Sequence, residues 1–232
     1  MLKKIIVTGG DSRFANELKK IKSKYKFIFR NKKQFNILSI KSIQNNLKNF
    51  KPDCVLHLAG LSRPMSLHSK NINKSIDLNI IGTANIVKAC NEKKIKIIFF
   101  SSNYVYPGKK GNYKEKDPVL PWNNYGWSKL GSEAAVQMYK NSLIIRACMT
   151  EKPFTHKSAF TNVKTNFIFH DEFAKLLIKV IPFKGIINIG GKTQSIYNFA
   201  KKYNRNINKK KSTGQLPQNI FMNLAKLNTL IK

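Results

Sequence analysis

Acidic residues are scarce in this sequence of 232 residues. Aspartate and glutamate together number 11, against 43 lysines and arginines, so the formal net charge is +32. Lysine clusters neutralise phosphates, and such a charge would suit a protein that binds nucleic acid or another polyanion. The lysines are, however, spread through nearly every segment together with many asparagines and isoleucines, as AT-rich codons would produce. We therefore expect no specific nucleic-acid partner, although a positive field favours ligands that carry a diphosphate.

Cysteine is also rare, and its three copies lie far apart. Cys54, Cys90 and Cys148 are single and odd in number, which argues against a disulfide framework and against a clustered metal site. We predict that all three side chains are buried in the core and that the protein has no metal site.

Long apolar runs are missing as well. Even the longest runs, such as 97–100 and 143–145, fall far short of the roughly 20 residues of a membrane span. The first ten residues hold only a four-residue apolar stretch, which is too short for the core of a secretory signal. We expect a cytoplasmic protein without a membrane partner.

What the chain does contain is an alternation of short apolar runs with helical patterns. Its hydrophobic content of 42% is enough for one sizeable core. The predicted strands are 2–8, 25–29, 37–40, 54–58, 95–100, 143–145, 167–169 and 185–189, and the predicted helices are 14–21, 43–50, 76–92, 127–139, 171–181 and 195–203. The Lys/Asn-rich segment 204–214 is expected to be an exposed loop. This rhythm predicts an α/β fold with a doubly wound parallel sheet, covered by helices on both faces.

A glycine-containing turn follows the first predicted strand. Residues 8–15, TGGDSRFA, lie where backbone N–H groups meet a pyrophosphate in dinucleotide-binding units, although an ordinary glycine turn before a helix would look the same. Arg30 follows the second strand, and no carboxylate stands there to bind a ribose 2′-hydroxyl. The absence of that carboxylate favours NADP(H) over NAD(H). Arg13 and Arg30 are the expected phosphate contacts, because a guanidinium binds phosphate in a bidentate manner.

Tyr125 and Lys129 stand four residues apart, a spacing that puts both side chains on one face of a helix. A phenol has an unperturbed pKa of about 10. A neighbouring ammonium favours the phenolate, so the pair suits proton exchange near neutral pH. The spacing alone also fits a plain amphipathic helix.

The surroundings of this pair resemble the active-site region of the extended short-chain dehydrogenases that modify sugar nucleotides. Residues 115–129 show the pattern E-x-x-P-x-x-P-x-x-x-Y-G-x-S-K, and residues 101–108 resemble the Ser/Thr segment of that family. The turn resembles the family's T-G-x-x-G-x-x-G, with Ser12 and Ala15 in place of two glycines. Residues 166–174 resemble a further segment of that family, and residues 185–200 and 216–227 resemble the dTDP-4-dehydrorhamnose reductases in particular. The resemblance covers nearly the whole chain and is weakest between 147 and 165.

The resemblance implies a Rossmann-type fold, a nicotinamide cofactor, and catalysis by Ser102, Tyr125 and Lys129. The implied cofactor-binding positions are Thr8, Gly9, Gly10, Ser12, Arg13, Phe14, Arg30, Leu58, Ala59, Gly60, Asn79 and Lys129, and the implied substrate-binding positions are Ser62, Asn103 and Tyr104. Asn79 is equally compatible with an amide that packs between helices. His57 is expected to be a satisfied core or strand-end histidine.

The resemblance also implies a domain plan. Residues 1–150 are expected to form the NAD(P)-binding domain with the catalytic residues. Residues 151–232 are expected to form a small, reduced substrate lobe, interleaved with the last elements of the sheet. Only about 20 residues link Arg146 to the segment at Phe167, where members of the family usually insert more substrate-binding structure. Members of the family often form homodimers through the helices beside the catalytic tyrosine, which makes a homodimer a candidate assembly.

The implied reaction is the reduction of a 4-keto sugar nucleotide, in which Tyr125 transfers a proton as hydride moves at the nicotinamide. Two alternatives stay open. Epimerases and dehydratases of nucleotide sugars use the same core. A non-catalytic cofactor-binding scaffold is favoured by Ser12 and by the short lobe, and is opposed by the intact set of Ser102, Tyr125 and Lys129.

Overall fold

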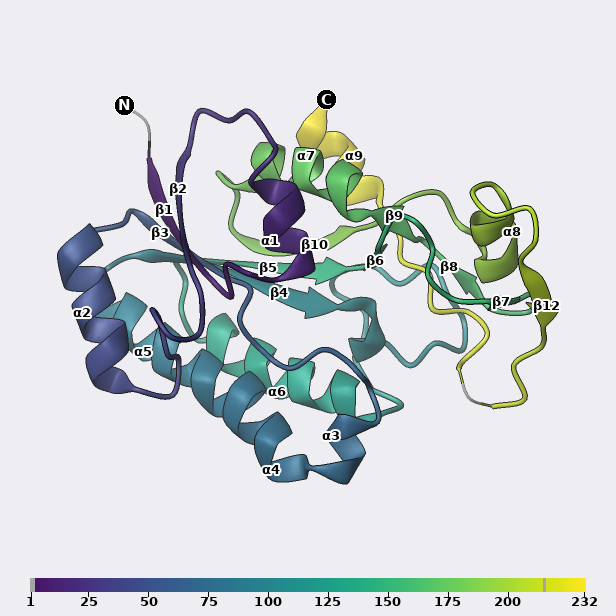
Figure 1. Ribbon diagram of the computed structural model, residues 1–232, viewed down its shortest axis with the longest axis horizontal. Helices are drawn as coiled ribbons and strands as arrows, with labels where there is room; N and C mark the ends of the chain where they lie inside the picture. Colours follow the sequence, from purple (N-terminus) through teal and green to yellow (C-terminus); the bar gives the residue numbers. More distant parts are fainter. Residues whose placement is uncertain (1–2, 215) are drawn as a thin grey trace.

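A six-stranded parallel sheet forms the centre of the protein in a computed structural model, which describes residues 3–214 and 216–232 (Figure 1). Its spatial order is β10-β5-β4-β3-β1-β2. The strands are β1 (Lys4–Thr8), β2 (Lys26–Arg30), β3 (Cys54–His57), β4 (Lys96–Ser102), β5 (Ser142–Ala147) and β10 (Gly185–Ile189). The strand order reverses at β1, since β2 lies on one side of it and β3 on the other. The predicted doubly wound sheet is confirmed; Leu2, which the first predicted strand included, lies outside the described residues.

Helices cover both faces of the sheet. One face carries α1 (Arg13–Leu18), α7 (His170–Val180) and α9 (Ala225–Ile231), and the other carries α2 (Ile40–Phe50), α5 (Gly82–Glu92) and α6 (Asn124–Gln137) (Figure 1). The central strands are therefore buried on both sides, which is why they read as continuous apolar runs. All three cysteines are buried, as predicted.

A small lobe lies beyond the ends toward which β4 and β5 point (Figure 1). It contains α8 (Ile196–Lys201) and three pairs of short strands: β6 (Met149–Thr150) with β9 (Ile168–Phe169), β7 (Ser158–Phe160) with β12 (Asn208–Lys210), and β8 (Lys164–Thr165) with β11 (Gln194–Ser195). Phe199 packs at its centre, with its ring 5.0 Å from that of Phe169. The helices α7 and α9 and strand β10 belong to the main sheet and its covering layer. The C-terminal part of the chain therefore contributes both to the main sheet and to the small lobe.

Two sequence-based assignments are wrong. Residues 37–40 form no strand: Ser39 accepts a hydrogen bond from the Ser42 backbone N–H at 3.2 Å and so begins α2 at Ile40. Phe35 and Ile37 are buried from a turn, which explains an apolar run without β pairing. In the second case, the expected loop 204–214 contains β12, which is exposed but pairs in parallel with β7.

The connections between β3 and α6 hold short irregular helices that the sequence did not indicate as separate elements. These are α3 (Leu67–Lys70), α4 (Ile72–Ser75), the π-helical turn η1 (Ile76–Ile81) and the 3-10 turn η2 (Asn103–Val105). A π-turn in place of a continuous helix often marks a functional region. In the part of the chain that the structure describes, no helix is long and apolar enough to cross a membrane.

Candidate active site

Tyr125 lies in the first turn of α6, and Lys129 lies one turn further along. Helix α6 begins at Asn124, three residues before the predicted start at Trp127, because the Asn123 side chain accepts a hydrogen bond from the Gly126 N–H at 2.8 Å. An asparagine at this position caps the free N–H groups of a helix. The predicted common face of Tyr125 and Lys129 therefore exists.

The Tyr125 ring is fixed between two other rings. His68 approaches it edge-on with centroids 5.1 Å apart, and Tyr104 does so at 5.8 Å. Burial raises the pKa of Tyr125, while the nearby Ser102 hydroxyl and the charge of Arg63 act in the opposite direction. The free protein thus keeps this phenol protonated at neutral pH, with a hydroxyl and a cation beside it that would stabilise a phenolate.

Ser102 ends β4 and turns the chain into η2. Its Oγ accepts a hydrogen bond from the Tyr104 N–H at 3.2 Å, so the residue caps this turn as well as facing Tyr125. The structure thus brings Ser102 and Tyr125 together from two elements, as the resemblance implied.

Among the described residues, Lys129 has no carboxylate within ion-pair distance. Its ammonium lies 4.3 Å from the centroid of the Phe99 ring and makes no hydrogen bond within the described part of the chain. Burial lowers the pKa of Lys129 to about 8, against the opposing effect of Glu133. Three donors are therefore available to a ligand beside Tyr125.

Asn79 lies in η1 and joins the loop after β3 to the catalytic helix. Its Nδ2 donates to Ser128 Oγ at 2.8 Å and to the Leu61 carbonyl at 3.0 Å, and its Oδ1 accepts from the Leu61 N–H at 2.6 Å. The side chain is buried and all of its hydrogen-bonding groups are used by the protein. This geometry is that of the packing amide, and it positions α6 relative to the loop that follows Gly60.

A buried ion pair binds α6 to the sheet. The Arg146 guanidinium, near the end of β5, donates to both carboxylate oxygens of Glu133 on α6, and also to the Tyr106 hydroxyl at 2.8 Å. Both charged side chains are almost fully buried.

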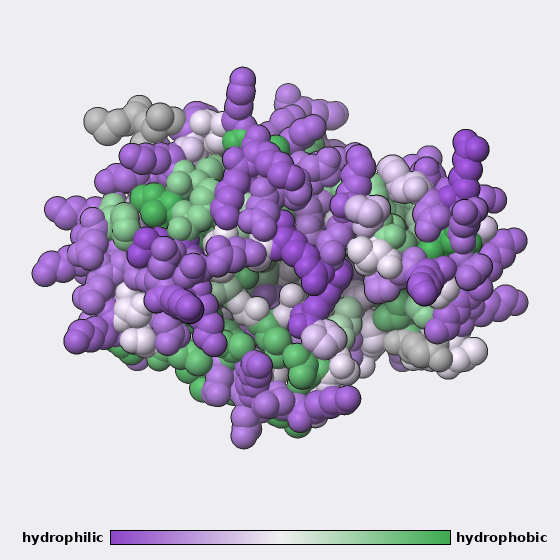
Figure 2. Space-filling view, in the orientation of Figure 1, coloured by the Kyte–Doolittle hydropathy of each residue, from purple (hydrophilic) through white to green (hydrophobic). Residues whose placement is uncertain are grey.

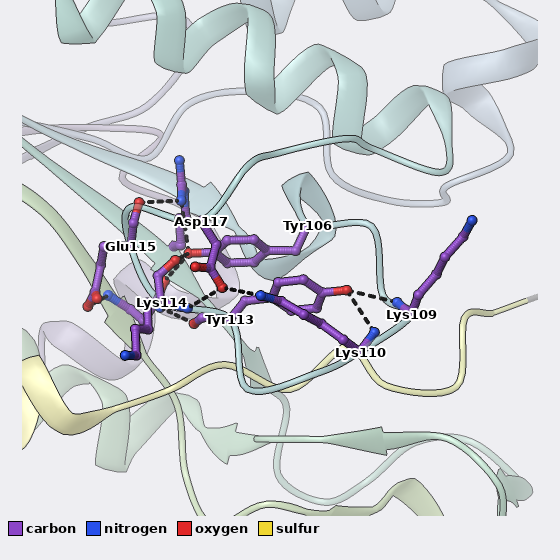
Figure 3. A network of polar contacts seen from close by, with 9 residues as sticks. Tyr106, Lys109, Lys110, Tyr113, Lys114, Glu115 and Asp117 are labelled. Atoms are coloured by element: carbon purple, nitrogen blue, oxygen red, sulfur yellow. Dashed lines mark hydrogen bonds and ion pairs between the residues drawn. The ribbon is translucent and has the colours of Figure 1, made fainter.

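The glutamate of the E-x-x-P pattern belongs to the adjoining network. Glu115 accepts a hydrogen bond from the Asn188 N–H of β10 at 3.0 Å and, through its carbonyl, one from Arg146 at 3.1 Å. Figure 3 shows Tyr106 stacked on Tyr113 beside these residues, with ring centroids 4.8 Å apart. Glu115 therefore holds the segment before α6 on the sheet and does not face Tyr125.

The glycine turn packs against the ends of two strands. A Cβ on Gly9, whose φ is +67°, would lie 2.8 Å from the Ala59 nitrogen, and a Cβ on Gly10 would lie 2.7 Å from the Arg30 nitrogen. Only glycine permits this approach. The turn thus leaves its backbone at the edge where β1, β2 and β3 end.

Ser12 replaces a glycine of the family pattern and has a local role. Its Oγ accepts a hydrogen bond from the Ala15 N–H at 3.2 Å and caps α1. The Phe14 side chain is buried against Phe100 and Phe173, at 5.1 and 5.5 Å between ring centroids, so it packs in the core.

Thr8 is also internal. Its hydroxyl bonds to His57 Nδ1 at 2.8 Å and accepts from the Ala59 N–H at 3.1 Å. His57 uses its other nitrogen for Thr83 at 3.1 Å, and burial lowers its pKa to about 3. His57 is thus a satisfied core histidine, as expected. The Thr8 hydroxyl stabilises the turn by joining it to the end of β3.

Arg30 extends from the end of β2 over the Phe50 ring, with 5.0 Å between guanidinium carbon and ring centroid. Its Nε is buried and has no hydrogen-bond partner among the described residues. A buried donor without a partner is costly, so this geometry fits a residue that receives an anionic ligand.

The remaining predicted positions differ in exposure. Leu58 and Ala59 are half-buried, while Gly60 and Ser62 are exposed on the loop after β3. Asn103 is buried and donates to the Ile220 carbonyl at 3.1 Å, and Tyr104 is buried against Trp122. Asn103 therefore joins the catalytic segment to the small lobe.

Two residues that the sequence analysis did not single out lie in this site. His68 is buried, with Nδ1 bonded to Ser75 Oγ at 2.6 Å and Nε2 without a partner in the described residues. Arg63, on the loop after Gly60, is close enough to influence the pKa of Tyr125. No spacing rule links either residue to Tyr125, since His68 lies on the short helix α3 and Arg63 on the loop before it, and only the fold brings this segment to Tyr125. No group of three or more His, Cys, Asp or Glu side chains within the described ranges is arranged to hold a metal.

Solved structures with this fold include two groups of nucleotide-sugar enzymes. The dTDP-4-dehydrorhamnose reductase of Bacillus anthracis, in complex with NADP, has a TM-score of 0.89 at 19% identity, covering 99% of this chain and 92% of that one. The UDP-glucose 4-epimerase of Thermus thermophilus, in complex with NAD, has a TM-score of 0.76 at 14% identity, covering 97% and 92%. At these identities the likeness shows the fold.

Curated relatives match in sequence over shorter stretches. The β subunit of methionine adenosyltransferase 2 from Pongo abelii is 30% identical over 103 residues, which are 44% of this chain and 30% of that protein. The spore coat polysaccharide biosynthesis protein SpsK of Bacillus subtilis is 31% identical over 147 residues, which are 62% of this chain and 52% of SpsK. The matches thus span between about a third and half of these relatives' length.

A family model covers most of the chain. Residues 3–150, which include the glycine turn, Ser102, Tyr125 and Lys129, match the family described as the RmlD substrate binding domain. The chain therefore belongs to the RmlD substrate binding domain family.

Proposed function

We propose that this protein is an NADP(H)-dependent reductase of a 4-keto sugar nucleotide, of the dTDP-4-dehydrorhamnose reductase type. The observation that carries the proposal is the convergence of Ser102, Tyr125 and Lys129 at the carboxyl edge of the sheet, in a chain of this family. The similarity to the dTDP-4-dehydrorhamnose reductase of Bacillus anthracis supports the choice of substrate class.

The roles follow from the geometry of the three side chains. Tyr125, protonated in the free protein, gives its proton to the carbonyl oxygen of the sugar. Ser102 donates a hydrogen bond to the same oxygen and orients it. Lys129 binds ribose hydroxyls with its free donors, and its charge stabilises the phenolate that Tyr125 becomes. A bound reduced nicotinamide would supply the hydride that the carbonyl carbon accepts.

The residues at the strand ends fit a dinucleotide. Gly9 and Gly10 let the turn pack against the ends of β3 and β2, which places the start of α1 at the strand ends, where its first backbone N–H groups would meet a diphosphate. Arg30 holds its guanidinium over the Phe50 ring at the end of β2, and a charged fork of donors there would suit a 2′-phosphate better than a 2′-hydroxyl. We therefore propose NADP(H) in preference to NAD(H). Thr8, Ser12, Phe14 and Asn79 would act by shaping the site, since their side chains are engaged within the protein.

The two parts of the chain would divide the ligands. Residues 1–150 would bind the cofactor and carry the catalytic groups, and the lobe within residues 151–232 would bind the nucleotide sugar together with Ser62, Asn103 and Tyr104. Both ligands are metabolites of the cytoplasm, where we expect the protein to act.

A homodimer is part of the proposal. Ile72, Ile76 and Ile81 on the helices after β3, and Trp127 on α6, are exposed large apolar side chains, with Trp127 49% exposed. Figure 2 shows apolar surface along the lower edge of the molecule, where Figure 1 draws α3 to α6. Burial of such side chains favours association. Sedimentation of the wild type should give twice the monomer mass, and a Trp127→Glu variant should sediment as a monomer.

A second candidate function is a cofactor-binding subunit without turnover of its own. The 28–32% identity to methionine adenosyltransferase 2 β subunits favours it. Epimerisation of a nucleotide sugar is a third, supported by the fold of the Thermus thermophilus epimerase.

The experiment that separates these functions is an assay of NADPH oxidation with dTDP-4-dehydrorhamnose as substrate. The reductase proposal predicts turnover by the wild type, and at least about a thousandfold slower turnover by Tyr125→Phe, at the level expected for loss of a general acid. NADPH binding by Tyr125→Phe should stay within about twofold of the wild type, a change under about 0.5 kcal/mol. NADPH binding without turnover by either protein would favour the cofactor-binding subunit. Interconversion of nucleotide sugars without net NADPH oxidation would favour the epimerase.

A further inference from the structure

Arg13 and Arg63 both donate a hydrogen bond to one oxygen of Glu151. The Nη1 atoms of the two guanidinium groups meet at Oε1 of this carboxylate. We call Arg13 and Arg63 the arginine pair. Its members come from separate segments, since Arg13 begins α1, Arg63 lies on the loop after β3, and Glu151 directly follows β6.

The arginine pair is only partly neutralised. Two guanidinium groups carry two positive charges, and Glu151 returns one negative charge through a single oxygen. The Arg13 and Arg63 side chains are 62% and 42% exposed, against 19% for Glu151. A dissolved anion can therefore reach both arginines without unfolding any element.

The arginine pair borders the candidate active site. Arg13 extends from the end of the glycine turn. The charge of Arg63 acts to lower the pKa of Tyr125 and of Tyr104. His170, the first residue of α7, is within electrostatic range of Arg13, Arg63 and Glu151. Figure 2 shows a hollow near the centre of this face, crossed by a band of the most hydrophilic side chains. A ligand that enters at the strand ends would meet the pair.

We propose that the arginine pair is a binding site for the diphosphate of a ligand, and that Glu151 occupies this site until the diphosphate replaces it. Each guanidinium has five N–H donors in one plane, arranged as a fork. Each arginine donates only one hydrogen bond to the shared Glu151 oxygen, so most of these donors are unused. A diphosphate carries more negative charge and enough oxygens for both forks. Glu151 lies in the segment that leads into the small lobe. Its release would therefore also break the contacts of this segment with α1 and with the loop after β3.

The diphosphate has two possible sources, the cofactor and the nucleotide sugar. This choice rests on the proposed function, whereas the anion site itself does not. Inorganic pyrophosphate tests the site without reference to the reaction, NADPH tests the cofactor, and dTDP tests the nucleotide of the substrate.

The experiment compares Glu151→Gln with Asp117→Asn by calorimetric titration with the three probes. Glutamine keeps the size of Glu151 but cannot hold two guanidinium groups by charge. Asp117 forms an exposed ion pair with Lys110, so its asparagine variant removes an equal charge and an ion pair elsewhere (Figure 3). We expect Glu151→Gln to bind pyrophosphate, and the ligand that uses the site, about fivefold more tightly than Asp117→Asn does, the size expected for ion pairs that solvent reaches.

A second substitution tests the direction of the effect. In the Arg63→Gln background, Glu151→Gln should raise the affinity for pyrophosphate by less than about twofold, because one of the two guanidinium groups is already missing. A gain with NADPH assigns the site to the cofactor, and a gain with dTDP assigns it to the nucleotide sugar. Equal or weaker binding by Glu151→Gln relative to Asp117→Asn, with all three probes, would overturn the inference. A pyrophosphate gain in a protein that does not oxidise NADPH would contradict only the proposed function.

Discussion

Arg146 and Glu133 form a two-point ion pair in the interior, with Nε to Oε1 at 3.1 Å and Nη2 to Oε2 at 2.8 Å. The Arg146 side chain is 3% exposed and that of Glu133 is fully buried. Glu133 lies one turn after Lys129 on α6, while Arg146 lies near the end of β5. The pair therefore fixes the helix that carries Tyr125 and Lys129 at one depth on the sheet.

Removal of one partner should be costly, because the other charge is then buried alone. We expect Glu133→Ala to lower the free energy of unfolding by about 3–5 kcal/mol. Urea denaturation followed by circular dichroism measures this change. Asp117→Asn, which breaks an exposed ion pair, serves as the control and should unfold at nearly the wild-type urea concentration. A Glu133→Ala midpoint equal to that of the control would contradict the role given to the pair.

Cofactor binding should weaken as the pH rises through about 8. Burial lowers the pKa of Lys129 to about 8, so its ammonium loses a proton above this pH while it is charged below it. The charged form is the one that attracts an anionic cofactor. The Kd of NADPH, measured by fluorescence titration between pH 6.5 and 9.5, should rise between pH 8 and 9.

Lys129→Arg provides the comparison for this pH dependence, since a guanidinium stays protonated over the whole range. Its NADPH affinity should change little between pH 6.5 and 9.5. A wild-type affinity that is equally flat would show that the charge of Lys129 does not control binding.

Arg30 should decide between the two nicotinamide cofactors. Arg30→Gln removes the charged fork from the Phe50 ring, and we expect the Kd of NADPH to rise about tenfold, as for loss of a charge-assisted hydrogen bond. The Kd of NADH should change less than about twofold. Lys88→Gln, an exposed change on α5, controls for net charge. Equal weakening of both cofactors by Arg30→Gln would place the arginine away from a 2′-phosphate.

His68 should act through the orientation of Tyr125. An asparagine at this position can keep the bond to Ser75, but it removes the ring that lies 5.1 Å from that of Tyr125. We expect His68→Asn to lower kcat about tenfold, with little change in the melting temperature, because a loosely placed acid reacts less often.

His156→Asn is the matched control for His68, since His156 packs only at the lobe, 5.3 Å from Phe154. It should leave kcat within about twofold of the wild type. If both histidine variants reduce kcat equally, the edge-on contact with Tyr125 has no special role.

Much of the fold and part of the site could be predicted from the sequence. Strands buried on both faces appear as short apolar runs, and helices as longer periodic patterns, because the local burial of each residue sets these periods. This reasoning gave a wrong strand at residues 37–40, because an apolar residue such as Ile37 can be buried in a turn as fully as in a strand. In the same way, the sequence did not show that the Phe14 side chain packs against Phe100 and Phe173, while a contact of Phe14 with the cofactor stays a prediction.

By itself the sequence determined the α/β architecture, the glycine turn and the pairing of Tyr125 with Lys129, because each of these depends on residues a few positions apart. Only the tertiary structure decided which groups surround Tyr125. His68 reaches it from α3 and Arg63 from the loop before α3, and Glu151 reaches Arg63 from a segment 88 residues away in the chain. Contacts of this kind depend on how loops pass over the end of a sheet, and no local period in the sequence records that path.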